Sequence, residues 1–287
     1  MKNRKHKILD HPILGYFLLI LFAQFVASLI SPFIDNPIGS IIPGYIKEYE
    51  MFGSTVESAS GIGNAVGSLA AVGIFRLWFR PEFKGCLTRK ALGTGLLMLA
   101  PFLAIHYLGS IVSWFTFGTS SVLLAFLMAF APGFGEEIAF RGLGIANYMR
   151  TIKSEDKIWT VFWLSSIVFG FVHMTNIASG ASVANSIIQS VYATGIGMLF
   201  AAVYLRTGNI WPTIIGHFTV DFLEFIRADI GDSGGIMLNM GVGDWITVAA
   251  GCFAAFWAIR LMNKEHFPEI MELWKDKWSG GKTIETL

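Results

Sequence analysis

The feature that most limits the fold of this chain is a series of long apolar stretches. Hydrophobic residues make up 54% of the 287 residues and charged residues only 14%, against roughly 25% charged in soluble domains. A membrane-spanning helix needs about 20 consecutive, mostly apolar residues. Breaks rich in basic residues or in Gly, Pro and Asn separate eight such stretches, at 13–33, 58–79, 91–115, 120–149, 158–176, 182–205, 209–226 and 244–262. The sequence therefore predicts an all-α, polytopic transmembrane helix bundle of about eight spans.

The first apolar stretch follows a short basic segment that looks like the n-region of a signal peptide. It is long and has no small-x-small cleavage site, so we expect a retained first helix. We expect a cytoplasmic N-terminus over 1–12, the transmembrane bundle over 13–262 and a cytoplasmic amphipathic tail over 263–287. The tail mixes Trp and aliphatic residues with Lys and Glu, which suits a helix on the inner membrane surface. Packing of the tail on the bundle is an equal alternative.

The basic residues indicate how the chain is oriented. With an even number of spans both termini share one side, and that side carries nearly all of the Lys and Arg residues. The opposite loops carry only Lys47 and Arg227. The positive-inside rule then puts both termini in the cytoplasm. A net charge of +1 gives no reason to expect a nucleic-acid partner. The two cysteines, Cys86 and Cys252, make neither a disulfide framework nor a Cys-based metal site.

Six ionisable residues form three groups inside the fourth, fifth and seventh apolar stretches. They are Glu136, Glu137 and Arg141, then His173, then His217 and Asp221. A charged residue at the centre of a bilayer costs about 3 kcal/mol on insertion scales, so such residues usually face a protein interior or a wet cavity. Carboxylates and imidazoles are the groups that activate water or stabilise an oxyanion. The pattern predicts a membrane-embedded hydrolase.

The first group follows Pro132 and two glycines, which are expected to loosen or kink the span. On a helix resumed there, Glu137 and Arg141 are four residues apart and can pair. Glu136 then points about 100° away from this pair. We therefore assign a structural role to Glu137 and Arg141, and the role of a free carboxylate base to Glu136. A purely structural Glu-Glu-Arg cluster is an equal alternative.

The role of each histidine is predicted from the residues near it in the sequence. A lone histidine on an apolar helix is usually a satisfied core residue, and we interpret His106 in this way. Phe169 lies one turn before His173 on the same face. His217 and Asp221 are four residues apart, so the carboxylate can orient the imidazole or both can reach one ligand. The chain has no His-Glu-x-x-His motif, which excludes the soluble zincin class.

Glu-Glu-x-x-x-Arg, Phe-x-x-x-His and His-x-x-x-Asp, in this order on separate spans, resemble the motifs of one protease family. This is the type II CAAX prenyl endopeptidase and bacteriocin-processing (CPBP or Abi) family of intramembrane proteases. The resemblance covers about 120–226. It implies that Glu136 and His173 activate a water that attacks a peptide carbonyl, and that His217 and Asp221 stabilise the oxyanion. Asp221 stands where the best-understood members have Asn, and an ionised Asp cannot donate to an oxyanion.

The predicted function is that of an intramembrane endopeptidase in a bacterial cell membrane. Its expected partners are the lipid bilayer and a membrane-associated peptide or lipidated protein as substrate. Processing of peptide pheromones or bacteriocins is favoured over CAAX cleavage if the source lacks prenylation. The favoured mechanism needs no cofactor, and the alternative is Zn²⁺ held by His173, His217 and Glu136. The rival functions are a non-catalytic scaffold or bacteriocin self-immunity protein of the same fold, and a proton-coupled transporter.

Overall fold

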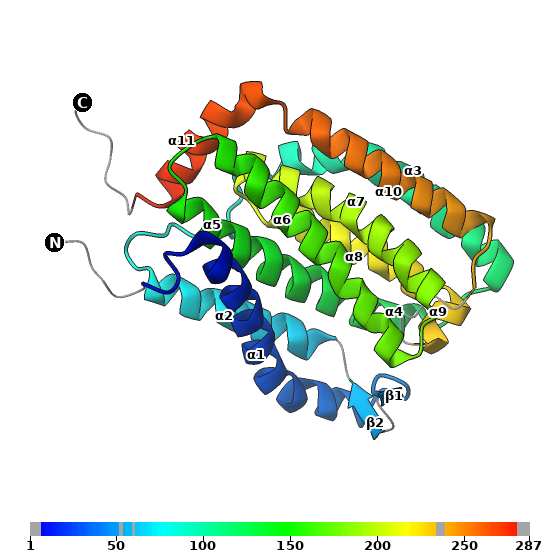
Figure 1. The fold of residues 1–287 in the computed structure, drawn as a ribbon. Helices are drawn as coiled ribbons and strands as arrows, with labels where there is room; N and C mark the ends of the chain where they lie inside the picture. The colour runs from blue at the N-terminus through cyan, green and yellow to red at the C-terminus, as the bar shows by residue number, and fades with distance from the viewer. Residues whose placement is uncertain (1–6, 52–53, 59–60, 234–238, 280–287) are drawn as a thin grey trace, which may run out of the picture.

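Helices account for nearly all of the secondary structure in the computed structural model, which describes residues 7–51, 54–58, 61–233 and 239–279 (Figure 1). The predicted all-α membrane bundle is confirmed. Within the described residues, six helical segments are long and apolar enough to cross a membrane, namely Pro12–Gly39, Leu92–Phe117, Val122–Thr151, Asp156–Ser179, Val183–Thr207 and Val242–Leu261. Two further helices, α2 (Ile62–Trp78) and α8 (Trp211–Phe225), have 17 and 15 residues. About eight spans is compatible with this arrangement.

The bundle is built around α7 (Val183–Thr207), which has the most deeply buried of the long apolar segments. It packs against α6 (Asp156–Val172) and α10 (Val242–Leu261), and α10 in turn packs on α3 (Leu92–Phe117). In Figure 1, α1 (Pro12–Gly39) and α2 form one side of the bundle, and α3 and α10 form the opposite side. The helix α8 and the span that carries Glu136 lie between the two sides and bring the motif residues into the interior.

A short β-hairpin connects α1 to α2. Its strands β1 (Lys47–Met51) and β2 (Ser54–Ser58) are antiparallel. The first helix ends at Gly39, beyond the predicted end at residue 33. The reason is Asp35, a buried carboxylate that accepts hydrogen bonds from Tyr45 Oη at 2.5 Å and from the backbone N–H of Gly63 at 2.9 Å. These bonds satisfy the charge inside the bundle and fix the end of α1 to the start of α2.

The span that carries Glu136 is not a regular α-helix. It consists of α4 (Val122–Met128), the π-helical turns η2 (Ala131–Glu136) and η3 (Ile138–Ile145), and α5 (Ala146–Thr151). Pro132 cannot donate a backbone hydrogen bond, which favours an irregular turn here. Two glycines allow close approach of neighbouring helices, because a Cβ on Gly133 would meet Phe218 of α8 at 2.8 Å and one on Gly135 would meet Asn64 of α2 at 2.1 Å. The π-helical turns therefore pack tightly on α2 and α8 beside Glu136.

The C-terminal helix closes one end of the bundle. After η5 (Lys264–His266), α11 (Phe267–Lys277) buries its apolar face, and Trp274 Nε1 donates to the carbonyl of Leu205 at 3.0 Å. Lys277 Nζ donates to the carbonyl of Gly85 at 3.0 Å. The start of α1 lies at the same end (Figure 1), where Asp10 pairs with Arg150 at 2.7 Å. The helix thus packs on the bundle, as in the second alternative for the tail.

The start of α8 lies inside this closed end. Asn209, just before α8, is fully buried, and its Nδ2 donates to the carbonyl of Lys90 at 2.9 Å. The loop that precedes α3 therefore covers the beginning of α8. This places His217, although it is only six residues into its helix, at the level of residues much further along the neighbouring spans. At its other end α8 continues into α9 (Ala228–Ser233).

Candidate active site

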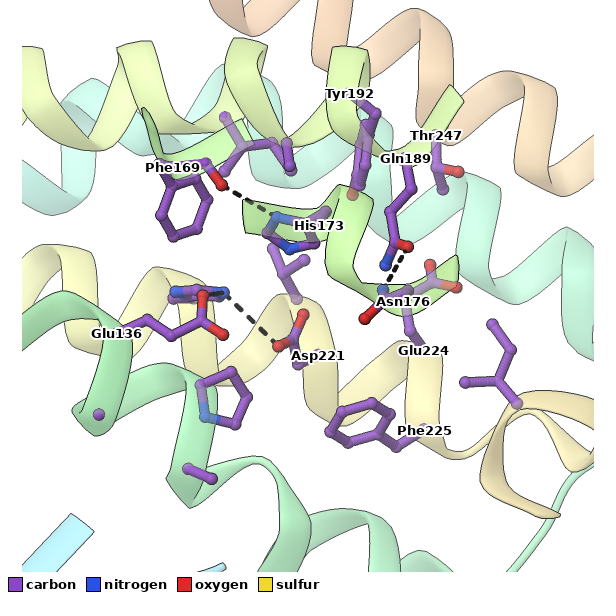
Figure 2. Close-up of a pocket in the computed structure, with 18 of the residues that line it drawn as sticks. Glu136, Phe169, His173, Asn176, Gln189, Tyr192, Asp221, Glu224, Phe225 and Thr247 are labelled. Atoms are coloured by element: carbon purple, nitrogen blue, oxygen red, sulfur yellow. Dashed lines mark hydrogen bonds and ion pairs between the residues drawn. The ribbon is translucent and has the colours of Figure 1, made fainter. Parts of the chain in front are cut away.

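A cavity of about 400 Å³ lies between the helices, and its lining extends to Asn176, Phe225 and Ile230, near the end of the bundle opposite to α11. Its wall contains four of the predicted site residues, Glu136, His173, His217 and Asp221. They come from η2, from the start of η4 (His173–Ser179), and from α8. Figure 2 shows that the side chains of Glu136, His173 and Asp221 point toward one another from these separate elements. The folding of the chain thus brings at least one residue of each of the three predicted groups to one polar cavity.

His217 is surrounded by three carboxylates. Its Nε2 lies 3.5 Å from Asp221 Oδ2 and 4.0 Å from Glu136 Oε2, while its Nδ1 lies 2.9 Å from Glu137 Oε1. A carboxylate of a buried ion pair only accepts hydrogen bonds, so the proton of this last contact belongs to Nδ1. The ring is therefore held through Nδ1, and Nε2 is the nitrogen directed at the cavity carboxylates.

Glu137 lies behind the cavity and is completely buried. Its Oε1 accepts a hydrogen bond from Arg141 Nη1 at 2.8 Å, so the predicted pair is present. The same oxygen also accepts the bond from His217, a contact between two spans that sequence analysis did not propose. The orienting carboxylate on Nδ1 is thus Glu137, and Asp221 faces the other nitrogen.

Phe169 links the second motif to the other two. The Arg141 guanidinium lies 4.2 Å from the centroid of the Phe169 ring, within cation–π range. Arg141 Nη2 also donates to the carbonyl of Gly197 at 3.2 Å. The Phe169 ring is 5.7 Å from the ring of His217 and 5.4 Å from that of His173. One aromatic side chain therefore packs against Arg141 of the first motif and against both histidines.

His173 is held by the last turn of α6, which precedes η4. Its Nδ1 lies 3.0 Å from the carbonyl oxygen of Phe169, which can only accept, so Nδ1 carries the proton. In the neutral ring Nε2 then has a free lone pair. Among the described residues, no hydrogen bond or ion pair joins His173 directly to Glu136 or His217. The cavity between them has room for a water molecule.

A second polar cluster borders the cavity and was missed by sequence analysis. Glu224 lines the cavity wall, and its Oε1 accepts a hydrogen bond from Ser110 Oγ at 2.9 Å. His106 Nε2 is 3.6 Å from the same oxygen, and His106 Nδ1 is 3.0 Å from Tyr192 Oη. The expected burial of His106 is present, but its acidic neighbour comes from a distant helix. The seven-residue spacing of His217 and Glu224, which places both on one face of α8, is the signal that could have revealed this cluster.

The proposed zinc ligands do not fit a metal ion in this arrangement. A catalytic zinc site needs about three protein ligands, each about 2 Å from the ion. Among the described residues no three His, Cys, Asp or Glu side chains are placed to hold one ion. We therefore derive no step of the reaction through a metal.

Comparison with known proteins identifies the segment that contains this cavity. Residues 118–223 match the model of the type II CAAX prenyl endopeptidase Rce1-like family. The matched range includes all six predicted site residues and ends just before Glu224. No curated protein and no solved structure matches the chain. Residues 118–223 are thus similar to the Rce1-like family, and the predicted resemblance of this chain to the CPBP family of membrane proteases is confirmed.

Proposed function

We propose that this protein is an intramembrane endopeptidase that cleaves membrane-associated or lipidated peptides by attack of a water molecule. The observation that carries the proposal is that Glu136, His173, His217 and Asp221 all line one cavity inside a bundle of apolar helices. Burial of these groups among apolar helices costs free energy, so ionisable residues in such a place usually mark a functional site. A hydrolytic site explains why carboxylates and imidazoles, rather than carboxylates alone, meet there.

Glu136 is the group we assign as the base. Its side chain is 34% exposed, so a water molecule in the cavity can reach it, and its nearest ionic neighbour is His217 Nε2 at 4.0 Å. The lone pair of His173 Nε2 offers a second acceptor for the same water. Together they hold the water, and Glu136 takes its proton as the oxygen attacks the peptide carbonyl. Glu136 then gives this proton to the leaving amine nitrogen as the C–N bond breaks.

His217 is the group we assign to the developing oxyanion. With both ring nitrogens protonated, Nδ1 donates to Glu137 and Nε2 donates to the negatively charged oxygen. The bond to Glu137 fixes the direction of Nε2–H before the reaction begins. Asp221, 3.5 Å from Nε2, balances the charge of the ring and does not itself donate.

The distribution of basic residues indicates from which side of the membrane the substrate enters the cavity. The lining of the cavity extends toward the end of the bundle whose described loops contain only Lys47 and Arg227 as basic residues. We propose, from the positive-inside rule, that the opposite end with both termini is cytoplasmic. Substrates then enter from the outer half of the membrane, as secreted or membrane-spanning peptides do. A bacterial cell membrane is the setting we favour.

Two quenched-fluorescence peptides test the proposal with purified protein in lipid nanodiscs. One is an unmodified apolar peptide of about 20 residues, and the other is an S-farnesylated peptide that ends in a C-a-a-X sequence. We expect the wild type to cleave at least one of them and Glu136→Gln to cleave neither. Glu155→Gln, in an exposed loop, is the matched control and should behave as the wild type.

Mass spectrometry of the products distinguishes cleavage of an internal peptide bond from a rise in fluorescence that has another cause. A single internal cut that disappears only in Glu136→Gln supports the proposal. Equal rates for the wild type and Glu136→Gln, or no cleavage of either peptide, would contradict it and favour a non-catalytic scaffold or self-immunity protein of the same fold.

A further inference from the structure

Two side-chain amides on the cavity wall are bonded to each other. Asn176 Nδ2 donates to Gln189 Oε1 at 2.8 Å, and both residues line the cavity. Figure 2 shows this pair beside Asp221 and Glu224. We propose that the amide pair binds the main chain of the substrate about two residues from the bond that is cut. This inference rests on the proposed peptidase function and deepens it.

The local fold places Asn176 next to His173. Both lie on η4, a 3₁₀-helix that begins at His173. A 3₁₀-helix has three residues per turn, so residues three apart lie on the same face. The position of Asn176 is fixed further because its carbonyl accepts a hydrogen bond from the N–H of Ala181 at 3.0 Å, across the left-handed turn at Gly180 with φ of 96°. The amide is therefore part of the same rigid element as the histidine.

Gln189 comes from the cavity-facing side of α7. The other residues of α7 on the cavity wall are Tyr192, Ala193 and Ile196, so that with Gln189 they follow the spacing of one helical face. The amide pair thus joins two elements that pack on each other along the cavity. A substrate that lies across the pair would contact both η4 and α7.

The chemistry of the pair suits a peptide backbone. An amide has two N–H donors and one oxygen acceptor. In the bonded pair, Asn176 Oδ1 and Gln189 Nε2 remain, and neither bonds to another residue that the structure describes. They offer one acceptor and one donor, which match the N–H and C=O groups of an extended peptide as the edge of a β-sheet would. If both amides were turned over, the outward pattern would still be one donor and one acceptor.

The distance along η4 sets which peptide unit is bound. Three residues of a 3₁₀-helix advance about 6 Å. An extended peptide advances about 3.3 Å per residue. A carbonyl attacked beside His173 therefore lies about two residues along the substrate from the unit that contacts Asn176.

The test uses Asn176→Leu and Gln189→Leu, with Asn36→Leu as a matched control because Asn36 is an exposed amide on α1 that does not line the cavity. The substrate is whichever of the two quenched peptides shows Glu136-dependent cleavage, together with a series N-methylated at one amide at a time. Loss of a substrate hydrogen bond should raise KM about three- to tenfold. The value of kcat should stay within about twofold, because the contact is the same in ground and transition states. The Asn36→Leu control should match the wild type.

The N-methylated peptides identify which substrate N–H forms the hydrogen bond with Asn176. N-methylation about two residues from the cut should raise KM for the wild type as much as Asn176→Leu does. In Asn176→Leu the same methyl group should have no additional effect, because the bond is already absent. At other positions, the effect of N-methylation on KM should be independent of Asn176→Leu, so that the two fold-changes in KM multiply. Gln189→Glu, which keeps the acceptor for Asn176 but lacks the outward donor, should raise KM similarly and provides a test if a leucine variant fails to fold.

The amide-pair proposal would be overturned if the effects of N-methylation and of Asn176→Leu on KM multiplied at every methylated position. A fall in kcat at constant KM in Asn176→Leu or Gln189→Leu would also overturn it. In both cases Glu136-dependent cleavage would leave the proposed peptidase function intact. Absence of Glu136-dependent cleavage would contradict the peptidase function, and the amide-pair proposal with it.

Discussion

The carboxylate of Glu137 lies 2.9 Å from Nδ1 of His217, on a different membrane-embedded segment. The same oxygen is 2.8 Å from Nη1 of Arg141. One buried carboxylate therefore joins the first motif to the third, and the Phe169 ring against Arg141 adds the second. The three motifs form one packed unit behind the cavity, and the groups that face the cavity are supported by it.

Glu137→Gln should lower stability more than any substitution in the cavity itself. Arg141 is completely buried, and an amide at position 137 would leave its charge without a partner. Breaking a buried ion pair in this way costs about 3–5 kcal/mol. The change is measured by thermal unfolding of the purified protein and by the amount recovered from membranes. Glu269→Gln, on the exposed face of α11, is the control and should unfold as the wild type does.

Glu136→Gln should abolish cleavage without destabilising the protein. Its side chain is partly exposed, and its one ionic neighbour is 4.0 Å away, so an amide of the same shape disturbs little. Loss of a general base typically lowers kcat by about 10²- to 10⁴-fold. Unfolding temperature and kcat are measured on the same preparation. A protein that loses stability together with activity would indicate that Glu136, like Glu137, has a structural role.

The contrast between these two glutamates shows what could be predicted from sequence. The Glu137–Arg141 pair was predicted because helix geometry fixes the distance between residues four apart. The contact of Glu137 with His217 depends on how two spans pack, and the periodicity of one helix contains no information on that register. For the same reason His106 was correctly expected in the core, while its neighbour Glu224 was not identified.

The apolar stretches predicted the membrane bundle well, because length and composition alone distinguish a spanning segment. Local irregularities were harder to predict. Pro132 and its glycines indicated a break before Glu136, but the π-helical form of η2 depends on close contacts with α2 and α8. The placement of His217 level with the other site residues depends on the loop near Lys90, which covers the start of α8.

Activity should not depend on bound zinc. We expect 1,10-phenanthroline to leave the wild-type rate within about twofold, because the described side chains at the cavity are not arranged as the three ligands that a catalytic zinc needs. Asp221→Asn should retain part of the activity, and added Zn²⁺ should not restore the rest, since Asp221 is proposed to balance the charge of His217. Cleavage rates and metal content by mass spectrometry are measured together. Loss of activity with chelator, restored by Zn²⁺, would replace the metal-free mechanism.

Trp274→Ala should release α11 from the bundle. The indole is almost fully buried and donates to the carbonyl of Leu205 at 3.0 Å. Truncation of a buried tryptophan costs about 3–5 kcal/mol. Limited proteolysis should then cut the chain before α11 at a much lower protease concentration than in the wild type. Leu273→Ala, a neighbouring position that is only partly buried, should have a smaller effect.

The proposed orientation predicts which loops can be labelled in intact cells. Glu155→Cys lies between α5 and α6, at the end of the bundle that carries most of the basic residues. Ala184→Cys lies at the start of α7, at the cavity end, and both positions are exposed. The variants are made on a Cys252→Ala background, because Cys252 is exposed, while Cys86 is buried and protected from reagents. A membrane-impermeant maleimide should label Ala184→Cys in intact cells and Glu155→Cys only after permeabilisation, since basic loops stay in the cytoplasm. The reverse pattern would place the cavity end at the cytoplasmic face and direct the search for substrates to lipidated proteins of the inner leaflet.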